Sequence, residues 1–200
     1  MKRIIPLAMC LSICSCASIR ALHKPAEPIV GMDLSWKPTI AITPFDSLKT
    51  KPDTTATFTF AAFTDERTTH DTIGLSEVRG LSQSVTTKTD LGPWTGLHLG
   101  DCFTARHLKI VPTGGEYQIE GALLRAWVSE KKEYDGDISL RLTIINTATQ
   151  KKRTTVYTGG YSKWGLSRNA DNYREAVANS LVTIADQILG GIDSTLAATK

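Results

Sequence analysis

The sequence predicts an α+β domain, with an antiparallel or mixed β-sheet and two helices packed on one face. Three observations predict this fold. Apolar and polar residues alternate over several segments in the middle of the chain. A helical segment interrupts these strands, and a long apolar stripe with three- and four-residue spacing follows them. We expect a single domain over residues 35–200, preceded by a signal peptide (1–15) and a lipidated tether (16–34).

The first residues predict a signal peptide. Lys2 and Arg3 precede a mostly apolar run over residues 4–13. A run of about ten residues is too short to cross a bilayer, which needs about 20 helical residues. A short apolar run after a basic start is typical of a secretory signal.

Cys16 is the predicted site of lipid attachment. Ile13 lies three residues before it and the small Ser15 directly before it, a pattern that resembles a bacterial lipobox. The thiol is needed because the lipid is attached to sulfur. Cys14 departs from the small residues usual at that position, and the bulky Ile13 before it makes it a poorer acceptor.

The predicted anchor also predicts a location. Acyl chains hold a protein to a membrane at about 0.8 kcal/mol per buried CH₂. Ala17 follows the cysteine, in place of the Asp that commonly marks retention in the inner membrane. We therefore expect the outer membrane, on its periplasmic side. The alternative is a plain secretory signal cleaved near Ala17 or Ala21.

Charge and cysteine content narrow the function. Removal of residues 1–15 lowers the 23 Lys and Arg to 21, against 20 Asp and Glu, so the net charge falls from +3 to +1. This balance gives no argument for binding nucleic acid. Once Cys10 and Cys14 are cleaved off and Cys16 is acylated, Cys102 remains, so we expect no intramolecular disulfide.

The chain before the first clear strand is predicted to be extended. Residues 16–34 contain prolines and a glycine but few strongly apolar residues, which is typical of a tether between lipid and fold. Residues 35–45 contain two prolines, with Ile40 and Ile42 alternating, and predict a short edge strand at best.

Alternation predicts the first strands. Residues 55–63 place threonines on one face and apolar side chains on the other. The apolar set is Ala56, Phe58, Phe60 and Ala62. Residues 73–78 and 81–87 are weaker candidates, separated by Arg79 and Gly80.

A helix is predicted from Asp90, which can cap it, to about residue 107, with Pro93 in the first turn. Three glycines recur every four residues: Gly92, Gly96 and Gly100. They share one stripe, and each costs a helix about 1 kcal/mol relative to Ala. We infer that the stripe lies very close to the sheet. The alternative is a turn followed by a short helix from about Leu97.

The second half of the sheet has the clearest pattern. Residues 108–112 predict a short strand, and residues 117–128 become apolar on both faces, which predicts a central or doubly covered strand. Residues 138–144 alternate most clearly, and residues 153–161 return after a turn.

The last helix is predicted to start at a cap formed by Asn169 or Asp171. Its apolar stripe is Tyr173, Val177, Leu181, Ile184, Ile188 and Ile192. The pair Gly190 and Gly191 is expected to end or kink it.

The order of these elements resembles the YajG-type lipoprotein family. The matching stretches are Pro38-Thr39-Ile40, Asp65-Glu66-Arg67, Leu75-Ser76-Glu77-Val78, Thr104-Ala105-Arg106, Ala176-Val177, Asn179-Ser180-Leu181 and Thr183-Ile184-Ala185-Asp186, with a Tyr161-bearing strand leading into Asn169. The glycine-rich helix start and the longer segment before Thr55 depart from the family pattern. The resemblance implies a periplasmic, outer-membrane lipoprotein and carries over no catalytic residues.

Two clusters could carry chemistry. Asp65, Glu66 and Arg67, followed by His70 and Asp71, could form a metal or acid/base site, although such loop residues are usually solvated. A second pair, His98 and Cys102 near Asp101, would share a helix face, but zinc needs three or four ligands. No nucleophile elbow, HExxH or P-loop motif is present. We expect no catalytic residue, metal or cofactor.

The candidate partner surface is aromatic. Tyr157, Tyr161 and Trp164, with Trp127, could form an exposed patch, since aromatic residues are enriched at interfaces. The leading hypothesis is a non-enzymatic, lipid-anchored envelope protein that binds a protein partner, as an accessory to an envelope assembly or transport machine. The alternatives are a lipid- or glycan-binding module with an apolar groove between sheet and helices, and an unrecognised hydrolase.

Overall fold

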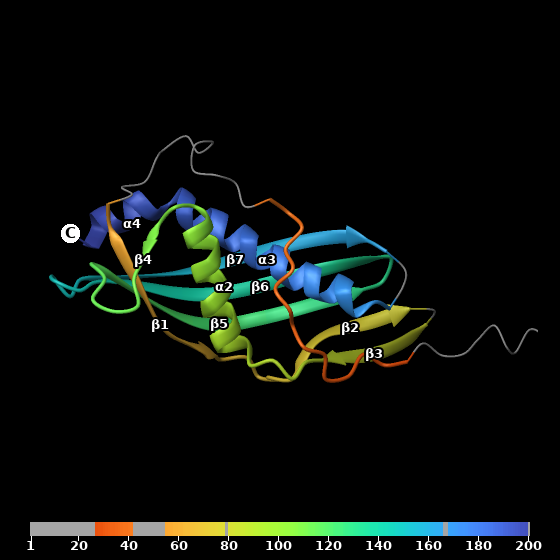
Figure 1. The fold of residues 1–200 in the computed structure, drawn as a ribbon. Coiled ribbons are helices and arrows are strands. Elements are labelled where there is room, and N and C mark those ends of the chain that lie inside the picture. Colours follow the sequence, from red (N-terminus) through yellow and green to blue (C-terminus); the bar gives the residue numbers. More distant parts are fainter. Residues whose placement is uncertain (1–26, 42–54, 79, 166–167, 200) are drawn as a thin grey trace, which may run out of the picture.

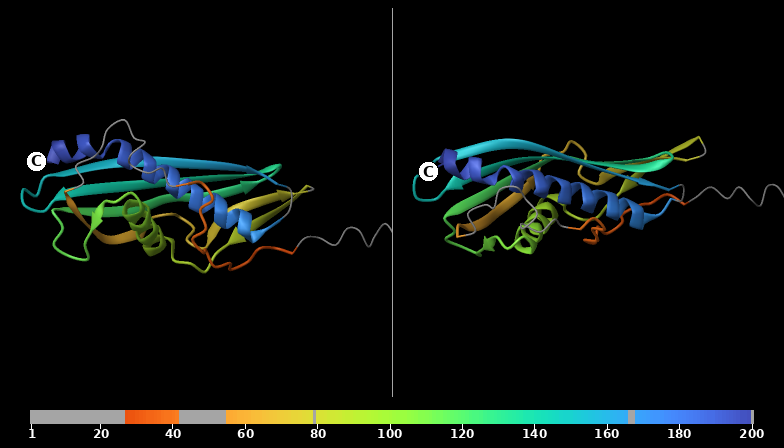
Figure 2. Two further views of the ribbon diagram at one scale, coloured as in Figure 1. Left: turned by 45° about the horizontal axis from the view of Figure 1, so that its top comes forward. Right: turned by 90° about the horizontal axis from the view of Figure 1, so that it is seen from above.

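The computed structural model describes residues 27–41, 55–78, 80–165 and 168–199 (Figure 1). The predicted signal peptide, Cys16 and the first part of the predicted tether lie outside these residues. The described residues form one mixed, open sheet of seven strands, together with three helices. This architecture confirms the predicted α+β class. The helices lie on one face of the sheet (Figure 2), and no helix in these residues is long and apolar enough to cross a membrane.

Three long antiparallel strands make the body of the sheet. β6 (Glu133–Asn146) lies between β5 (Tyr117–Glu130) and β7 (Lys152–Trp164). Short turns join them, so each strand pairs with its neighbour along nearly its whole length. This antiparallel body is the part that sequence alternation predicts most clearly.

Two shorter strands share the remaining edge of β5. β1 (Thr57–Asp65) pairs in parallel with the first half of β5, and β2 (Thr72–Val78) pairs in parallel with its end. β3 (Leu81–Thr86) forms a hairpin with β2, and β4 (Lys109–Ile110) adds a short parallel strand beside the start of β1. The far side of β1 beyond β4 is therefore an edge of the sheet.

β5 is a central strand, as one of the two predicted alternatives has it, with β6 on one edge and β1 and β2 on the other. A bulge explains why its apolar residues do not require cover on both faces. The pairing with β6 shifts between Leu123 and Arg125, and a bulge of this kind exchanges the faces of the residues that follow it. On the helix-covered face the buried residues are Tyr117, Ile119 and Leu123 before the shift and Ala126, Val128 and Glu130 after it, while the buried Ala122 lies on the other face. The apolar residues that seem to occupy two faces therefore line mainly one.

The helices begin and end where the sequence predicts. α2 (Leu91–Ala105) is a single helix, and the N–H of Gly92 donates to Asp90 Oδ1 (3.2 Å). α3 (Ala170–Gly190) is capped by Asn169, and Gly191 separates it from α4 (Ile192–Thr199). The predicted last helix is thus two helices, because the glycine pair ends α3.

Two glycines of the sheet let α3 approach it closely. A Cβ atom at Gly136 in β6 would lie 2.7 Å from the carbonyl oxygen of Ala176, and one at Gly159 in β7 would lie 2.3 Å from that of Ser180. Both distances are shorter than real Cβ atoms show, so only glycine fits under this helix. α3 seals the sheet over β6 and β7 (Figure 1).

The N-terminal strap, residues 27–41, corrects two predictions. Met32 and Leu34 are buried, and the N–H of Met32 donates to the carbonyl of Thr86 (3.0 Å), so the predicted tether joins the fold before residue 34. The predicted edge strand is absent from the described residues 35–41. Instead the N–H groups of Thr39 and Ile40 donate to Asn179 Oδ1 on α3 (2.9 and 3.2 Å).

Candidate functional site

The three aromatic residues predicted as a partner surface do not share a face. Tyr157 and Tyr161 are half-buried against the core on the helix side, and Tyr161 Oη donates to Glu175 Oε1 of α3 (3.0 Å). Trp164 is 76% exposed and lies on the opposite face, because positions three apart in a strand point in opposite directions. The structure therefore does not bring them together as one patch.

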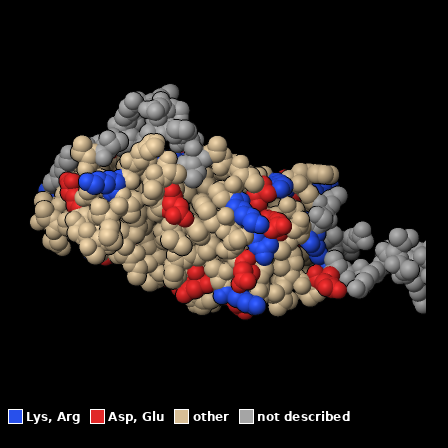
Figure 3. All heavy atoms as spheres, viewed as in Figure 1, with Lys and Arg blue, Asp and Glu red and all other residues tan. Residues whose placement is uncertain are grey.

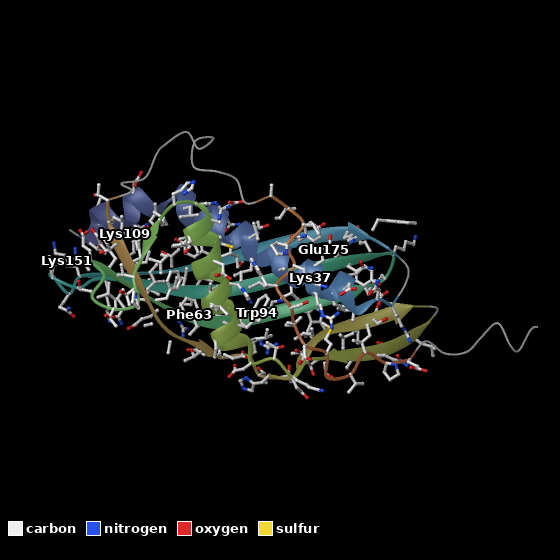
Figure 4. The ribbon with its side chains drawn as sticks, viewed as in Figure 1. Lys37, Phe63, Trp94, Lys109, Lys151 and Glu175 are labelled. Carbon is white, nitrogen blue, oxygen red and sulfur yellow. The ribbon has the colours of Figure 1, made fainter. Side chains whose placement is uncertain are left out.

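Tyr161 instead belongs to a set of hydrogen-bond donors around Glu175. Besides Tyr161, it accepts hydrogen bonds from Thr39 Oγ1 (2.8 Å) and Lys163 Nζ (2.5 Å). Burial alone would raise the pKa of Glu175, but these donors outweigh it and the pKa is lowered. The strap, α3 and β7 meet at this carboxylate, near Lys37 (Figure 4).

In the predicted acidic cluster, Asp65 and Arg67 form a structural ion pair. Arg67 is buried and donates from Nη2 to Asp65 Oδ2 (2.7 Å) and from Nε to Asp65 Oδ1 (2.9 Å). It also donates to the carbonyl oxygens of Thr72 and His70. Burial raises the pKa of Asp65, but the Arg67 hydrogen bonds prevail and hold it below its usual value. Both oxygens of the Asp65 carboxylate, at the end of β1, therefore accept hydrogen bonds from Arg67.

His98 and Cys102 do not converge on a shared site. The His98 ring stacks on Trp36 of the strap, with centroids 4.5 Å apart, and packs edge-on against Trp94. Cys102 is fully buried, and burial raises the pKa of its thiol to about 12. Within the described ranges, no group of three or more His, Cys, Asp and Glu side chains is placed to hold a metal ion.

An apolar groove lies between α2 and β1. It has a volume of about 470 Å³, and its lining is mainly apolar. Residues 60–63 of β1 form one wall, while Gly96, Leu97 and Gly100 form part of the α2 wall. Leu97 is 64% exposed at its rim. Charged side chains are sparse over α2 and β1 and gather around α3 and the strap (Figure 3).

The glycine stripe of α2 explains the shape of this groove. A Cβ at Gly92 would lie 2.8 Å from the carbonyl oxygen of Phe63, and one at Gly96 would lie 2.8 Å from the Phe63 ring. Phe63 is packed beside α2 (Figure 4). The predicted close approach is therefore confirmed for these two glycines. A Cβ at Gly100 would meet Phe60 only at 3.9 Å, so the groove is open there.

A bulge in β1 also affects the uncovered face of the sheet. The pairing with β5 shifts between Phe60 and Phe63, so that two residues of β1, Ala61 and Ala62, lie opposite the single residue Glu120. As a result Phe63 is buried and Ala62 is exposed, contrary to the predicted alternation. Both alanines also line a second, polar groove of about 350 Å³ on the uncovered face of the sheet.

On the side away from β5, the end of β1 lies against the start of α2, because a Cβ at Gly92 would lie 2.8 Å from the carbonyl oxygen of Phe63 and 2.9 Å from the amide nitrogen of Asp65. β4 pairs only with Thr57 and Phe58, and the N–H of Val111 donates to the carbonyl of Phe58 (2.8 Å). From Phe60 onward, no strand in the described part of the chain pairs with this side of β1.

Comparison with known proteins supports the fold but no family. No protein-family model matches the sequence, and no curated protein matches it. A protein from Xanthomonas campestris, described as DUF330, has a similar structure, with a TM-score of 0.59 and 13% identity. The similarity covers 80% of this chain and 94% of that chain. At this identity it shows likeness of fold alone.

Two other solved structures are lipoproteins by description. A candidate lipoprotein from Caulobacter crescentus has a TM-score of 0.41 and 10% identity over 53% of this chain and 83% of that chain. A minor lipoprotein from Acinetobacter baumannii has a TM-score of 0.38 and 13% identity over 70% and 93%. Both scores are below 0.5, so neither similarity carries an argument here. The resemblance to the YajG-type family stays a prediction.

Sequence reasoning expected an apolar groove between sheet and helices only as an alternative and did not locate it, although one signal was present. Leu97 is apolar but lies off the buried face of α2, between two glycines of the stripe. An apolar residue beside helix positions without side chains indicates a hollow with an apolar rim. The bulge at Ala61 and Ala62 also had a signal, because the alternation stops after Thr59 and residues 60–63 are all apolar.

Proposed function

We propose that this chain is a lipid-anchored protein of the bacterial envelope that acts by binding a protein partner and catalyses no reaction. Its place is the periplasmic side of the outer membrane, held by acyl chains on Cys16, as an accessory to an envelope assembly or transport machine. The lipobox-like residues Ile13, Ser15 and Cys16 support the anchor. The order of elements supports a place among YajG-type lipoproteins.

One observation carries the binding role: the apolar α2–β1 groove with Leu97 exposed at its rim. Exposed apolar patches on soluble domains commonly mark interaction sites. The two clusters that could have supported catalysis have structural roles, since Asp65 accepts hydrogen bonds from Arg67 and the Cys102 thiol is buried in the core.

Photo-crosslinking in cells tests this function. A photoreactive residue at position 97 of the full chain should give crosslinks to one protein, and the same residue at position 81 should not. Leu81 is the matched control, because it is also a largely exposed apolar side chain (48%) but lies in the β2–β3 hairpin. Equal crosslinking from both positions, or a turnover activity that copurifies with the chain, would contradict the proposal.

The anchor is tested separately. Cys16→Ala should release the protein from the membrane fraction and abolish labelling with a radioactive fatty acid. Cys14→Ala is the control and should leave both unchanged. If Cys14→Ala releases the protein from the membrane fraction instead, the lipid acceptor is Cys14.

The apolar lining favours a second candidate, a lipid-binding module. The groove between sheet and helix is the feature that such a module requires. A fluorescent fatty acid presented to the full chain distinguishes the two. Saturable binding that Leu97→Glu abolishes, together with no protein crosslinks from position 97, would favour the lipid.

A further inference from the structure

The sheet has one face that no helix of the described residues covers, because α2, α3 and α4 all lie on the other face (Figure 2). Alternate residues of β7 are exposed on this uncovered face, from Lys152 to Trp164. Two of them are large apolar side chains, Val156 (54% exposed) and Trp164 (76% exposed). Exposure alone does not say what covers the face, but the strand register shows that the face is complementary to itself.

Pairing between the strands arranges this face in rows that run across β5, β6 and β7. The middle row contains Thr158, the midpoint of β7, and Ser139, its partner in β6. The two rows that flank it are Ala122–Arg141–Val156 and Trp127–Asp137–Gly160. One flanking row therefore has a small residue where the other has a large one, and a basic residue where the other has an acidic one.

A second copy placed face to face and antiparallel about the middle row would bring each flanking row over the other. Val156 would lie over Gly160 of the second copy, where a Cβ would meet only the carbonyl oxygen of Gly136, at 3.5 Å. The half-buried Trp127 would lie over the small Ala122 of the second copy. Two sheets pack in this way about 10 Å apart, with their strand directions within about 30° of each other.

The charges of the two rows also match. Arg141 would lie over Asp137 of the second copy, and twofold symmetry makes this contact twice. Each group already belongs to a balanced pair, because Arg141 Nη2 lies 2.5 Å from Glu66 Oε1 and Asp137 Oδ2 lies 2.5 Å from Arg125 Nε. Arg125 is on the middle row and would face its own copy, but the Asp137 carboxylate paired with each Arg125 offsets this repulsion. Opposite charges placed over each other favour this orientation of the two copies.

The face is also large enough for a dimer. The 13 residues of β7 span about 43 Å at about 3.3 Å per residue, and three strands about 4.8 Å apart are about 14 Å wide. Each copy would therefore bury about 600 Å², or about 1,200 Å² for the pair. This area is at the lower end of the range for stable protein interfaces.

We propose that two copies of this chain pair through the uncovered faces of β5, β6 and β7 as an antiparallel dimer, with the twofold axis at Ser139 and Thr158. This inference goes beyond the proposed function, because it assigns a second surface and a second occupant. The α2–β1 groove lies on the helix side of the sheet and stays open in the dimer. Each dimer therefore presents two such grooves.

Cysteine crosslinking in intact cell envelopes tests the register. Cys102 is buried, so a short bis-maleimide should leave the wild-type chain uncrosslinked. Thr158→Cys, on the axis, should crosslink to a second copy and double the mass of the full chain on a denaturing gel. Thr154→Cys is the matched control and should not crosslink, because its two copies would lie eight residues apart, or about 26 Å. Cells that produce Thr154→Cys and Ser162→Cys chains together should give the crosslink, since these two positions would face each other.

Charge reversal tests the complementarity. Arg141→Glu and Asp137→Arg, each combined with Thr158→Cys, should each weaken self-association about tenfold, or about 1.4 kcal/mol. The chain that carries both reversals should recover the crosslink, because each row again faces the opposite charge. Arg153→Glu is the control and should leave the crosslink unchanged, since Arg153 is an exposed arginine of β7 that points to the helix side.

Three results overturn the proposal: no crosslink from Thr158→Cys, an equal crosslink from Thr154→Cys alone, or no recovery in the double reversal when its melting temperature shows a folded chain. A crosslink from Thr158→Cys to a different protein also overturns it, because that protein would be the occupant of the face. These results leave the proposed function standing, since its test is the crosslink from position 97 on the other side of the sheet.

Discussion

The two helix–sheet contacts of this molecule use glycine in opposite ways. Under α3 the glycines are in the sheet, where Gly136 and Gly159 meet the helix backbone and the contact is sealed. Under α2 the glycines are in the helix, where a Cβ at Gly96 would clash with the Phe63 ring but one at Gly100 would have only ordinary contact with Phe60 at 3.9 Å. The difference teaches that a glycine indicates close packing only where atoms of the other element fill its space. Where they do not, it leaves a groove.

The largest effect is expected where the contact is sealed. Gly159→Val should destabilise the fold by about 3 kcal/mol, because overpacking of a well-packed contact typically costs about 1–3 kcal/mol and the clash here is with backbone. Gly160→Ala is the matched control, since its Cβ would meet only the carbonyl oxygen of Gly136 at 3.5 Å. Urea denaturation of both variants measures the difference. Equal stabilities would mean that α3 does not lie against β7 as described.

A smaller loss is expected in the α2 contact. Gly96→Leu should destabilise by about 2 kcal/mol, because the Phe63 side chain must move to admit it. A ring can shift further than a helix backbone, so the cost should be below that of Gly159→Val. A melting temperature at or above that of the wild type would show that this face of α2 is not packed.

Substitution of Gly100, the third glycine of the stripe, should instead raise the stability of the fold. Gly100→Ala should stabilise the protein by about 1 kcal/mol, since Ala is the better helix former and its Cβ finds only ordinary contact with Phe60. Thermal unfolding beside Gly96→Ala isolates the effect, because both variants remove the same helix-propensity penalty. A loss of stability in Gly100→Ala would mean that the groove is closed at this point.

The smallest effect concerns pH at the end of β1. The folded pKa of Asp65 lies below its ordinary value, so the ion pair with Arg67 stabilises the fold above the unfolded pKa and is lost as pH falls through the folded pKa. The stability advantage of wild type over Asp65→Asn should therefore be largest near neutral pH and narrow below about pH 4. Urea denaturation across this range tests it, and a constant difference would contradict the account.

Much of the fold follows from local sequence signals. The alternation in β6 predicts its face without error, because no bulge interrupts its inward residues. The caps at Asp90 and Asn169 predict where α2 and α3 begin, since an N-cap acts on its own first turn. The glycine stripe predicts the close approach of α2, because the cost of glycine in a helix needs a compensating contact.

The candidate site does not follow in the same way. Bulges in β1 and β5 depend on pairing with other strands, so alternation alone assigns Ala62 and Leu124 to the wrong faces. Which strands pair with the second edge of β5, and so where the α2–β1 groove lies, is a property of the whole sheet. The grouping of Tyr161 with Trp164 fails for a local reason, because positions three apart in one strand point to opposite faces.

The most direct test of the account fills the groove without disturbing the fold. Gly100→Leu places a side chain in the α2–β1 groove at a position where its Cβ has only ordinary contact. In cells that carry a photoreactive residue at position 62, the account predicts that Gly100→Leu abolishes the crosslink to the partner, while the melting temperature of the full chain stays equal or rises. Persistence of the crosslink in this stably folded variant would contradict the claim that the groove is the binding surface.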